Sequence, residues 1–224
     1  MKSIKTDRAI AIQTLADVLD TGAYGNIALR KNLADSDIDP RARAFVTDMV
    51  NETLRNLIYI DHLISKFSNT PIPKLKPFIL NLLRISVCQI KFMEKIPDRA
   101  SVNEAVVLTK QFGFVNLASF VNGVLRNIAR DNSTISDQAL KYSYPKWLLQ
   151  KISTWLGTGE IVEDFLYHSH QPPPVIALVN IHKTSLEALK ASFENEGIVA
   201  AQLKNSSHPF LLLRQPGDIT RLSS

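Results

Sequence analysis

The chain has 224 residues, of which 45% are hydrophobic and 21% are charged. This composition is typical of a folded globular protein and argues against extensive disorder. The single cysteine, Cys88, excludes an intramolecular disulfide and a multi-cysteine metal site. No apolar run approaches the roughly 18 residues that would span a membrane, and the first twenty residues do not fit a signal peptide. A cytoplasmic location without membrane contact is therefore expected.

Positive charge is concentrated in the first part of the chain. The whole sequence contains 26 Lys and Arg against 21 Asp and Glu, a net charge of +5. Residues 1–130 contain 18 basic and 12 acidic residues, whereas residues 131–224 contain 8 and 9. The basic excess therefore belongs to the first 130 residues, where it can meet an anionic polymer.

Apolar residues in the first part of the chain recur at three- and four-residue steps, which predicts helices. Thr6 is the expected cap of the first helix, and a short second helix is predicted over residues 26–33. The pair Asp39-Pro40 has the residue types that begin a helix. Because the apolar pattern continues without a break to about Phe67, we expect one long helix there.

Three further helices are predicted before residue 131. Residues 74–93 are apolar on most sides, which indicates a central, well-covered helix. Ser101 and Glu104 have the spacing of a capping box, so the next helix is expected to begin there and to end near Gly113. A clean apolar stripe over residues 117–128 predicts the last one. Six helices and no strand signal predict an all-α bundle.

The pattern changes after residue 130. We expect a polar linker, two connector helices, and then a small α+β segment of βαββ order that follows three prolines. A capping box at Thr184–Glu187 is expected to open the helix of that segment. The predicted parts are 131–142 (linker), 147–155 and 160–167 (connector helices), 175–181, 198–203 and 210–213 (strands). As domains, we expect a helical domain over 1–134, a linker with connector helices over 135–171, and the start of a small α+β domain over 172–224.

Few residues are suited to catalysis or metal binding. Cys88 lies in the most apolar predicted helix, so a structural role is expected. His168 and His170 have no further ligand beside them at a suitable spacing, so no metal site is expected. The glycine-rich phosphate loops and the serine nucleophile motif are absent from the sequence. The chain by itself is therefore not expected to be catalytic.

Basic residues give the better indication of function. They gather at the predicted starts of helices and along one ridge of the sixth helix, without aromatic residues between them. From charge alone they indicate either solvated faces or contact with a nucleic acid, and composition does not separate RNA from DNA. The candidate contact residues are Lys5, Arg8, Arg30, Lys31, Arg41, Arg43, Arg126 and Arg130.

Two motifs carry a family resemblance. The run Asn103–Val106 (NEAV), followed by Phe120–Arg126 (FVNGVLR), resembles the closing helices of the NusB-like RNA-binding fold. The continuation then resembles the bacterial ribosomal RNA small-subunit methyltransferase B family (Sun/Fmu), which methylates carbon 5 of a cytosine in small-subunit rRNA. The segments that carry the second resemblance are Tyr142–Leu148, Pro172–Pro174, Val179-Asn180 and Lys183–Ser185.

The resemblance implies an RNA-binding, targeting N-terminal region of an S-adenosylmethionine-dependent rRNA (cytosine-C5) methyltransferase. Its implied partners are small-subunit rRNA and the enzyme's own C-terminal methyltransferase domain, which the family places after about residue 220. It also implies that Arg8, Arg41 and Arg43 contribute to the RNA surface. S-adenosylmethionine is implied for the full-length enzyme only, and no cofactor is expected in this chain.

The sequence departs from the family in two ways. The family strand after the prolines carries an arginine that is absent from Ala177–Asn180. The two catalytic cysteines of the family have no counterpart, and Cys88 matches neither of them. This chain alone is therefore expected to be inactive as a methyltransferase.

Two alternatives remain open at this stage. One is a NusB-type transcription antitermination module that docks a ribosomal protein, and the other is a helical scaffold without a nucleic-acid role. Residues 142–213 favour the methyltransferase family, because an antitermination module has no use for them. Arg126 also has two interpretations, since it either binds RNA or pairs with Glu104 on the preceding helix.

Overall fold

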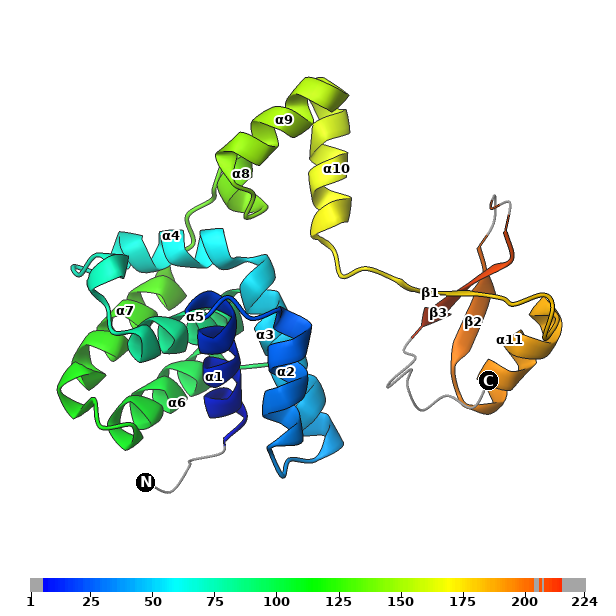
Figure 1. The fold of residues 1–224 in the computed structure, drawn as a ribbon. Coiled ribbons are helices and arrows are strands. Elements are labelled where there is room, and N and C mark those ends of the chain that lie inside the picture. Colours follow the sequence, from blue (N-terminus) through cyan, green and yellow to red (C-terminus); the bar gives the residue numbers. More distant parts are fainter. Residues whose placement is uncertain (1–5, 204–205, 207, 215–224) are drawn as a thin grey trace. The chain divides into compact units, whose positions relative to one another are not determined.

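The computed structural model describes residues 6–203, 206 and 208–214, which form two compact units (Figure 1). The first unit is Met1–Asp164 and the second is Phe165–Ser224, so the division falls inside helix α10 (Glu160–His170). Within the described residues, no helix is both long and apolar enough to cross a membrane.

Seven α-helices build the bundle of the first unit, and they pack together because each has apolar residues on one side. Helix α5 lies at its centre, because it packs against five of the others and is buried from residue 81 to residue 89. The predicted all-α bundle and its central helix are confirmed. The helices are α1 (Asp7–Leu19), α2 (Gly25–Ala34), α3 (Pro40–Arg55), α4 (Leu57–Phe67), α5 (Pro77–Phe92), α6 (Asp98–Gln111) and α7 (Ala118–Arg130).

Local chemistry begins two of these helices where the sequence predicts. The hydroxyl of Thr6 accepts the N–H of Ala9 at 3.2 Å, and the carboxylate of Asp39 accepts the N–H of Ala42 at 2.8 Å. Pro40 occupies the first position of α3, where a missing N–H costs no hydrogen bond. Both caps are confirmed.

The predicted long helix from Asp39-Pro40 to Phe67 is wrong, because the chain bends at Asn56. The Asn56 backbone has φ −101° and ψ 17°, and its side-chain amide donates to the Glu52 carbonyl at 3.0 Å and to the Glu52 carboxylate at 2.7 Å. An asparagine side chain that bonds to the preceding turn competes with helix continuation. The apolar spacing did not reveal the bend, since α3 and α4 bury residues in the same core.

The predicted start of α6 at Ser101 is also wrong. The helix begins at Asp98, directly after Pro97, and Ser101 lies inside it with 1% of its surface exposed. Proline favours an extended or turn conformation in the residue before it and cannot continue an upstream helix, so Pro97 is the boundary. A similar shift occurs at α11 (Leu186–Asn195), where Ser185 rather than Thr184 accepts the N–H of Ala188.

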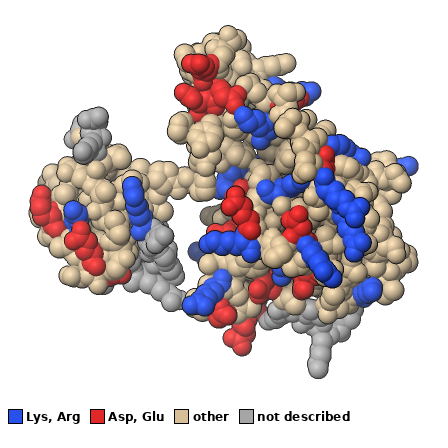
Figure 2. All heavy atoms as spheres, turned by 180° about the vertical axis from the view of Figure 1, so that it is seen from behind, with Lys and Arg blue, Asp and Glu red and all other residues tan. Residues whose placement is uncertain are grey.

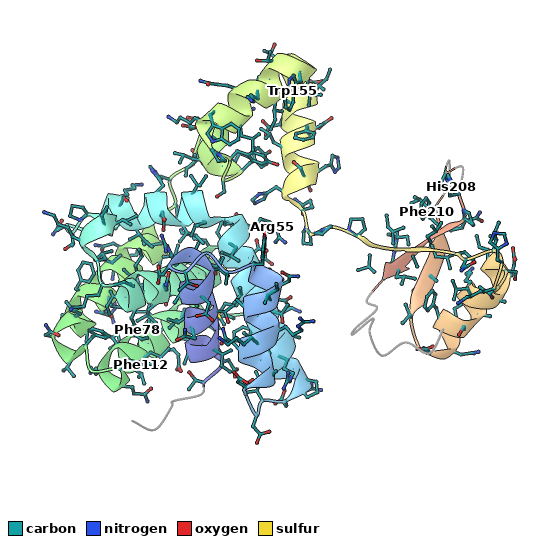
Figure 3. All side chains as sticks on the ribbon, viewed as in Figure 1. Arg55, Phe78, Phe112, Trp155, His208 and Phe210 are labelled. Atoms are coloured by element: carbon teal, nitrogen blue, oxygen red, sulfur yellow. The ribbon has the colours of Figure 1, made fainter. Side chains whose placement is uncertain are left out.

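Aromatic rings close one end of the bundle. Phe78 at the start of α5 stacks on Phe112 at the end of α6, with ring centroids 4.5 Å apart (Figure 3). Phe114 also stacks with Phe78, with ring centroids 5.4 Å apart. Stacked rings add to the area that they bury, so this contact fixes where α6 ends against α5.

After α7 the chain forms three further helices, α8 (Gln138–Lys141), α9 (Lys146–Leu156) and α10. The two connector helices are confirmed, whereas the segment expected to be only linker contains α8. Glu163 of α10 ties α8 to α10, because its carboxylate accepts hydrogen bonds from Gln138, from Lys141 at 2.6 Å and from the Tyr142 hydroxyl at 2.5 Å. Those hydrogen bonds, that of Lys141 above all, lower the pKa of Glu163 to about 2.

This contact predicts an acid-sensitive step at α8 and α10. Because the folded pKa of Glu163 lies below its ordinary value of 4.5, its stabilising effect is complete above about pH 4.5. The effect is lost as pH falls toward 2. We expect NMR to show the Glu163 carboxyl titrating near pH 2, with α8 amide signals shifting in the same range. Glu163→Gln is expected to remove this step, and an ordinary pKa for Glu163 would contradict the assigned contacts.

The second unit contains a three-stranded antiparallel sheet covered by one helix. The strands β1 (Val175–Leu178), β2 (Val199–Gln202) and β3 (Phe210–Arg214) have the order β1-β3-β2. Leu213 lies opposite Val175 on one side and Ala200 on the other. Phe193 of α11 is buried in the same cluster as Ala200, Leu211 and Leu213. The predicted βαββ segment is confirmed, although β1 ends at Leu178 rather than at residue 181.

Candidate nucleic-acid interface

The basic residues of the first unit differ in the number of contacts that their side chains make within the protein. Arg8 is half-buried, and its Nε donates to Gln89 at 3.2 Å while its guanidinium lies 5.6 Å from the centre of the Phe45 ring. It therefore joins α1 to α3 and α5. Since a guanidinium has five N–H donors, its other donors stay available to a ligand.

Arg43 also has a structural task. Its Nε and Nη2 donate to the carbonyls of Ile38 and Ser36, at 3.3 and 3.2 Å, and so close the turn before α3. Three other candidates, Arg30 and Lys31 on α2 and Arg41 on α3, are exposed. Within the described part of the chain, none of these three forms an ion pair or a side-chain hydrogen bond. Lys5 lies outside the described residues.

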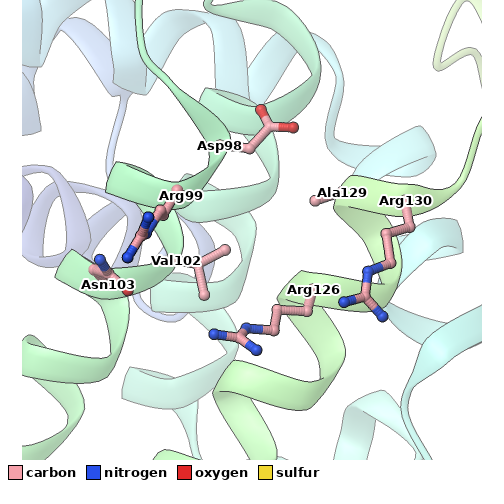
Figure 4. A pocket seen from close by; sticks show the side chains of 7 residues that line it. All are labelled: Asp98, Arg99, Val102, Asn103, Arg126, Ala129 and Arg130. Atoms are coloured by element: carbon pink, nitrogen blue, oxygen red, sulfur yellow. The ribbon is translucent and has the colours of Figure 1, made fainter.

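Arg126 and Arg130 of α7 line a surface hollow together with residues of α6 (Figure 4). Both arginines are exposed, and no ion pair joins Arg126 to Glu104 among the described residues. The α6 side contributes Arg99, which the sequence analysis did not single out. The lining residues are Asp98, Arg99, Val102, Asn103, Arg126, Ala129 and Arg130.

The wider surface mixes both signs of charge. In the view of Figure 2, Lys and Arg side chains are spread over the face of the first unit, with Asp and Glu among them. Several charges of the first unit form ion pairs with one another, as Lys66 and Asp131 do at 2.7 Å. The arginines and lysines that form no ion pair therefore indicate a nucleic-acid interface better than the total charge does.

The sole cysteine is not a functional group of this surface. Cys88 is fully buried in α5, with its Sγ 3.9 Å from the Met49 carbonyl oxygen. Burial raises the pKa of its thiol to about 12, which suppresses the reactive thiolate. Its predicted place in the core is confirmed. Over the described ranges, no three His, Cys, Asp or Glu side chains gather in a way that could hold a metal ion.

Comparison with known proteins identifies the first unit. The model of the NusB family matches residues 5–130. The chain belongs to the NusB family. A second model, described as a Methyltr_RsmF/B-like, ferredoxin-like domain, matches residues 144–220. The NusB-family part therefore contains α1 to α7, and the second match contains β1 to β3.

Individual relatives of this NusB-family chain fall into two groups. A protein of Bacillus subtilis (strain 168) named probable ribosomal RNA small subunit methyltransferase B is 35% identical over 199 residues, which cover 85% of this chain and 44% of the relative. The transcription antitermination protein NusB of Geotalea daltonii is 33% identical over 138 residues, which cover 58% of this chain and 95% of the relative. The chain spans about half the length of the curated methyltransferase B relatives that it matches.

A solved structure shows the same fold for the NusB-family part. The crystal structure of antitermination factors NusB and NusE in complex with dsRNA matches with a TM-score of 0.52 and 23% identity. The match covers 55% of this chain and 93% of the solved chain. At this identity the likeness establishes the fold alone.

Proposed function

We propose that this chain is the RNA-binding and targeting region of an S-adenosylmethionine-dependent methyltransferase that acts on cytosine carbon 5 of small-subunit rRNA. The observation that carries the proposal is the order of the two family matches, a NusB part followed by a Methyltr_RsmF/B-like, ferredoxin-like domain in one chain. The proposed division is an RNA-binding domain over 1–134, connector helices over 135–171 and the start of an α+β domain over 172–224.

A transcription antitermination module that docks a ribosomal protein is the second candidate. The NusB–NusE complex with dsRNA, which shares this fold, is the observation in its favour. One observation opposes this candidate. The match to the antitermination relative covers 95% of that relative but only 58% of this chain. Helices α8 to α10 and the sheet unit are therefore additional to that module. Of these, α9, α10 and the sheet unit lie in the region that the ferredoxin-like match covers.

The cofactor of the proposed enzyme does not fit the hollow between α6 and α7. S-adenosylmethionine carries a positively charged sulfonium, and three arginine side chains line that hollow against one carboxylate, that of Asp98. Like charges at close range repel, so this site is unsuited to the cofactor. We propose that the cofactor binds the part of the methyltransferase relatives that this chain does not cover. The function proposed for the described residues is RNA binding.

The proposed RNA surface uses the exposed basic residues first. Arg30 and Lys31 present free positive charge on α2, and Arg41 does so in the first turn of α3. Arg126 and Arg130 do so on α7. Arg8 and Arg43 position neighbouring elements and offer their remaining N–H donors. Lys5, outside the described residues, stays a contact predicted from the sequence alone. Phosphate contacts of this kind give affinity that falls as salt rises.

Charge reversal at Arg41 tests the proposed function. Arg41→Glu is expected to weaken binding to a small-subunit rRNA fragment about tenfold or more, because it removes one attraction and adds one repulsion. The slope of log affinity against log salt is expected to become shallower by about 1. Fluorescence anisotropy of the labelled RNA across a salt series measures both quantities.

Lys151→Glu is the matched control, because Lys151 of α9 is exposed, forms no ion pair within the described residues, and lies outside the NusB match. Its effect is expected to be much smaller. If the parent chain does not bind the rRNA fragment even at low salt, the proposed function is wrong. If the parent binds and Arg41→Glu weakens binding no more than the control does, Arg41 is not part of the RNA surface.

A further inference from the structure

We infer that the hollow between α6 and α7 is a binding site for backbone phosphate of RNA, held by Arg99, Arg126 and Arg130 (Figure 4). The inference rests on the proposed RNA-binding function and assigns it a second place on the bundle, apart from the residues at the starts of α1 and α3. Arg99 is a new member of the candidate site.

Positive charge exceeds negative charge in this hollow. Three guanidinium groups line it against the single carboxylate of Asp98. Within the described residues, none of the three arginines takes part in an ion pair or a side-chain hydrogen bond. Like charges brought into one hollow repel each other, and a bound anion removes that repulsion.

Other arginines of the same bundle have structural roles, in which their guanidinium groups donate hydrogen bonds within the protein. Arg84 forms two hydrogen bonds with Asp61, at 2.8 and 2.7 Å, and a third with Asn81 at 3.0 Å. Arg8 bonds to a glutamine of the core, and Arg43 bonds to two loop carbonyls. Arg99, Arg126 and Arg130 have no such partners among the described residues and are exposed, so their donors are available to a ligand.

The backbone adds to the attraction for an anion. Helix α6 begins at the hollow, where its first residues Asp98 and Arg99 are part of the lining. No side chain caps this helix, since Pro97 precedes it, so N–H groups of its first turn lack a side-chain acceptor. Helix N-termini attract phosphate through these groups. Asp98 opposes the effect with one negative charge, which the three arginines outweigh.

The shape and lining favour the backbone of a polymer. The floor is apolar, with Val102 4% exposed and Ala129 beside it, while the arginines and Asn103 stand exposed around it. No aromatic ring lines the hollow, so it offers no platform for stacking a base. Guanidinium groups match the geometry of phosphate oxygens, and the Asn103 amide adds a donor for phosphate or sugar.

Neutral substitutions at the three arginines test the inference. Arg99→Gln, Arg126→Gln and Arg130→Gln are each expected to weaken binding of the chain to a small-subunit rRNA fragment about tenfold. Each is also expected to make the salt slope shallower by about 1. The matched control is Lys110→Gln, which removes one exposed charge from the same helix outside the hollow and is expected to change affinity less than about twofold. Circular dichroism checks that every variant keeps the parent's helix content.

The outcomes separate this inference from the function on which it rests. If the parent does not bind the RNA, the proposed function fails and the inference fails with it. If the parent binds and the three arginine variants behave like Lys110→Gln, the inference is overturned while the proposed function stands.

A second arm separates RNA backbone from free phosphate. NMR titrations with the rRNA fragment and with inorganic phosphate alone follow the amides of residues 98–103 and 126–130. Shifts that saturate with RNA, and not with inorganic phosphate at equal concentration, support the inference. Saturation by inorganic phosphate, together with unchanged RNA affinity in the arginine variants, identifies a free-phosphate site and overturns it.

Discussion

Arg84→Glu is expected to lower the free energy of unfolding by at least about 3–5 kcal/mol, the cost typical of breaking a buried ion pair. The Arg84 side chain is 10% exposed and donates to both carboxylate oxygens of Asp61, which joins α5 to α4. Glutamate at this position brings a second negative charge against Asp61 and leaves Asn81 without its donor. Urea denaturation followed by circular dichroism measures the change.

Two further variants separate the charge effect from the loss of packing. Arg99→Glu makes the same charge change at an exposed position and is expected to alter stability by no more than about 0.5 kcal/mol. The double variant Arg84→Met, Asp61→Asn removes both charges and is expected to recover most of the lost stability. An Arg84→Glu protein with the parent's urea midpoint would show that the pair does not form in solution.

The bundle could be predicted because apolar spacing reports burial, and burial determines most of this fold. Val121, Leu125 and Ile128 recur at helical spacing and are all buried on one face of α7. The caps at Thr6 and Asp39 could also be predicted, because each depends only on a side chain and an N–H group three residues away. Local chemistry and the global fold agree at these positions.

The errors arose where a tertiary contact or a stronger local signal decided the outcome. Asn56 bends the chain although the apolar pattern runs through it. Ser101 and Glu104 have the spacing of a capping box, but Pro97 begins α6 earlier and packing buries Ser101. The short helix α8 lies in a polar segment, and Glu163, 22 residues beyond Lys141, is what ties it down. Such a contact has no signature in the local sequence.

The candidate site was less predictable than the fold, because residues of the same type make different contacts in the folded chain. Arg41 and Arg43 are two residues apart and look alike in the sequence, yet Arg41 is exposed and Arg43 bonds to two carbonyls. Arg99 precedes Ser101, where α6 was predicted to begin, and was not among the predicted contact residues. Only the packing of α6 on α7 brings it to one hollow with Arg126 and Arg130.

Leu125→Ala is expected to lower the free energy of unfolding by about 2–5 kcal/mol, since a fully buried leucine is replaced by a smaller side chain in a packed core. Its neighbour gives the matched contrast. Arg126 points to solvent from the next position of α7, so Arg126→Gln is expected to change stability by less than about 0.5 kcal/mol while weakening RNA binding. Urea denaturation and RNA anisotropy on the same two proteins check this separation. A stable Leu125→Ala protein would mean that the core relaxes into the space. A destabilised Arg126→Gln protein would mean that Arg126 has an intramolecular partner, and its place in the RNA surface would have to be withdrawn.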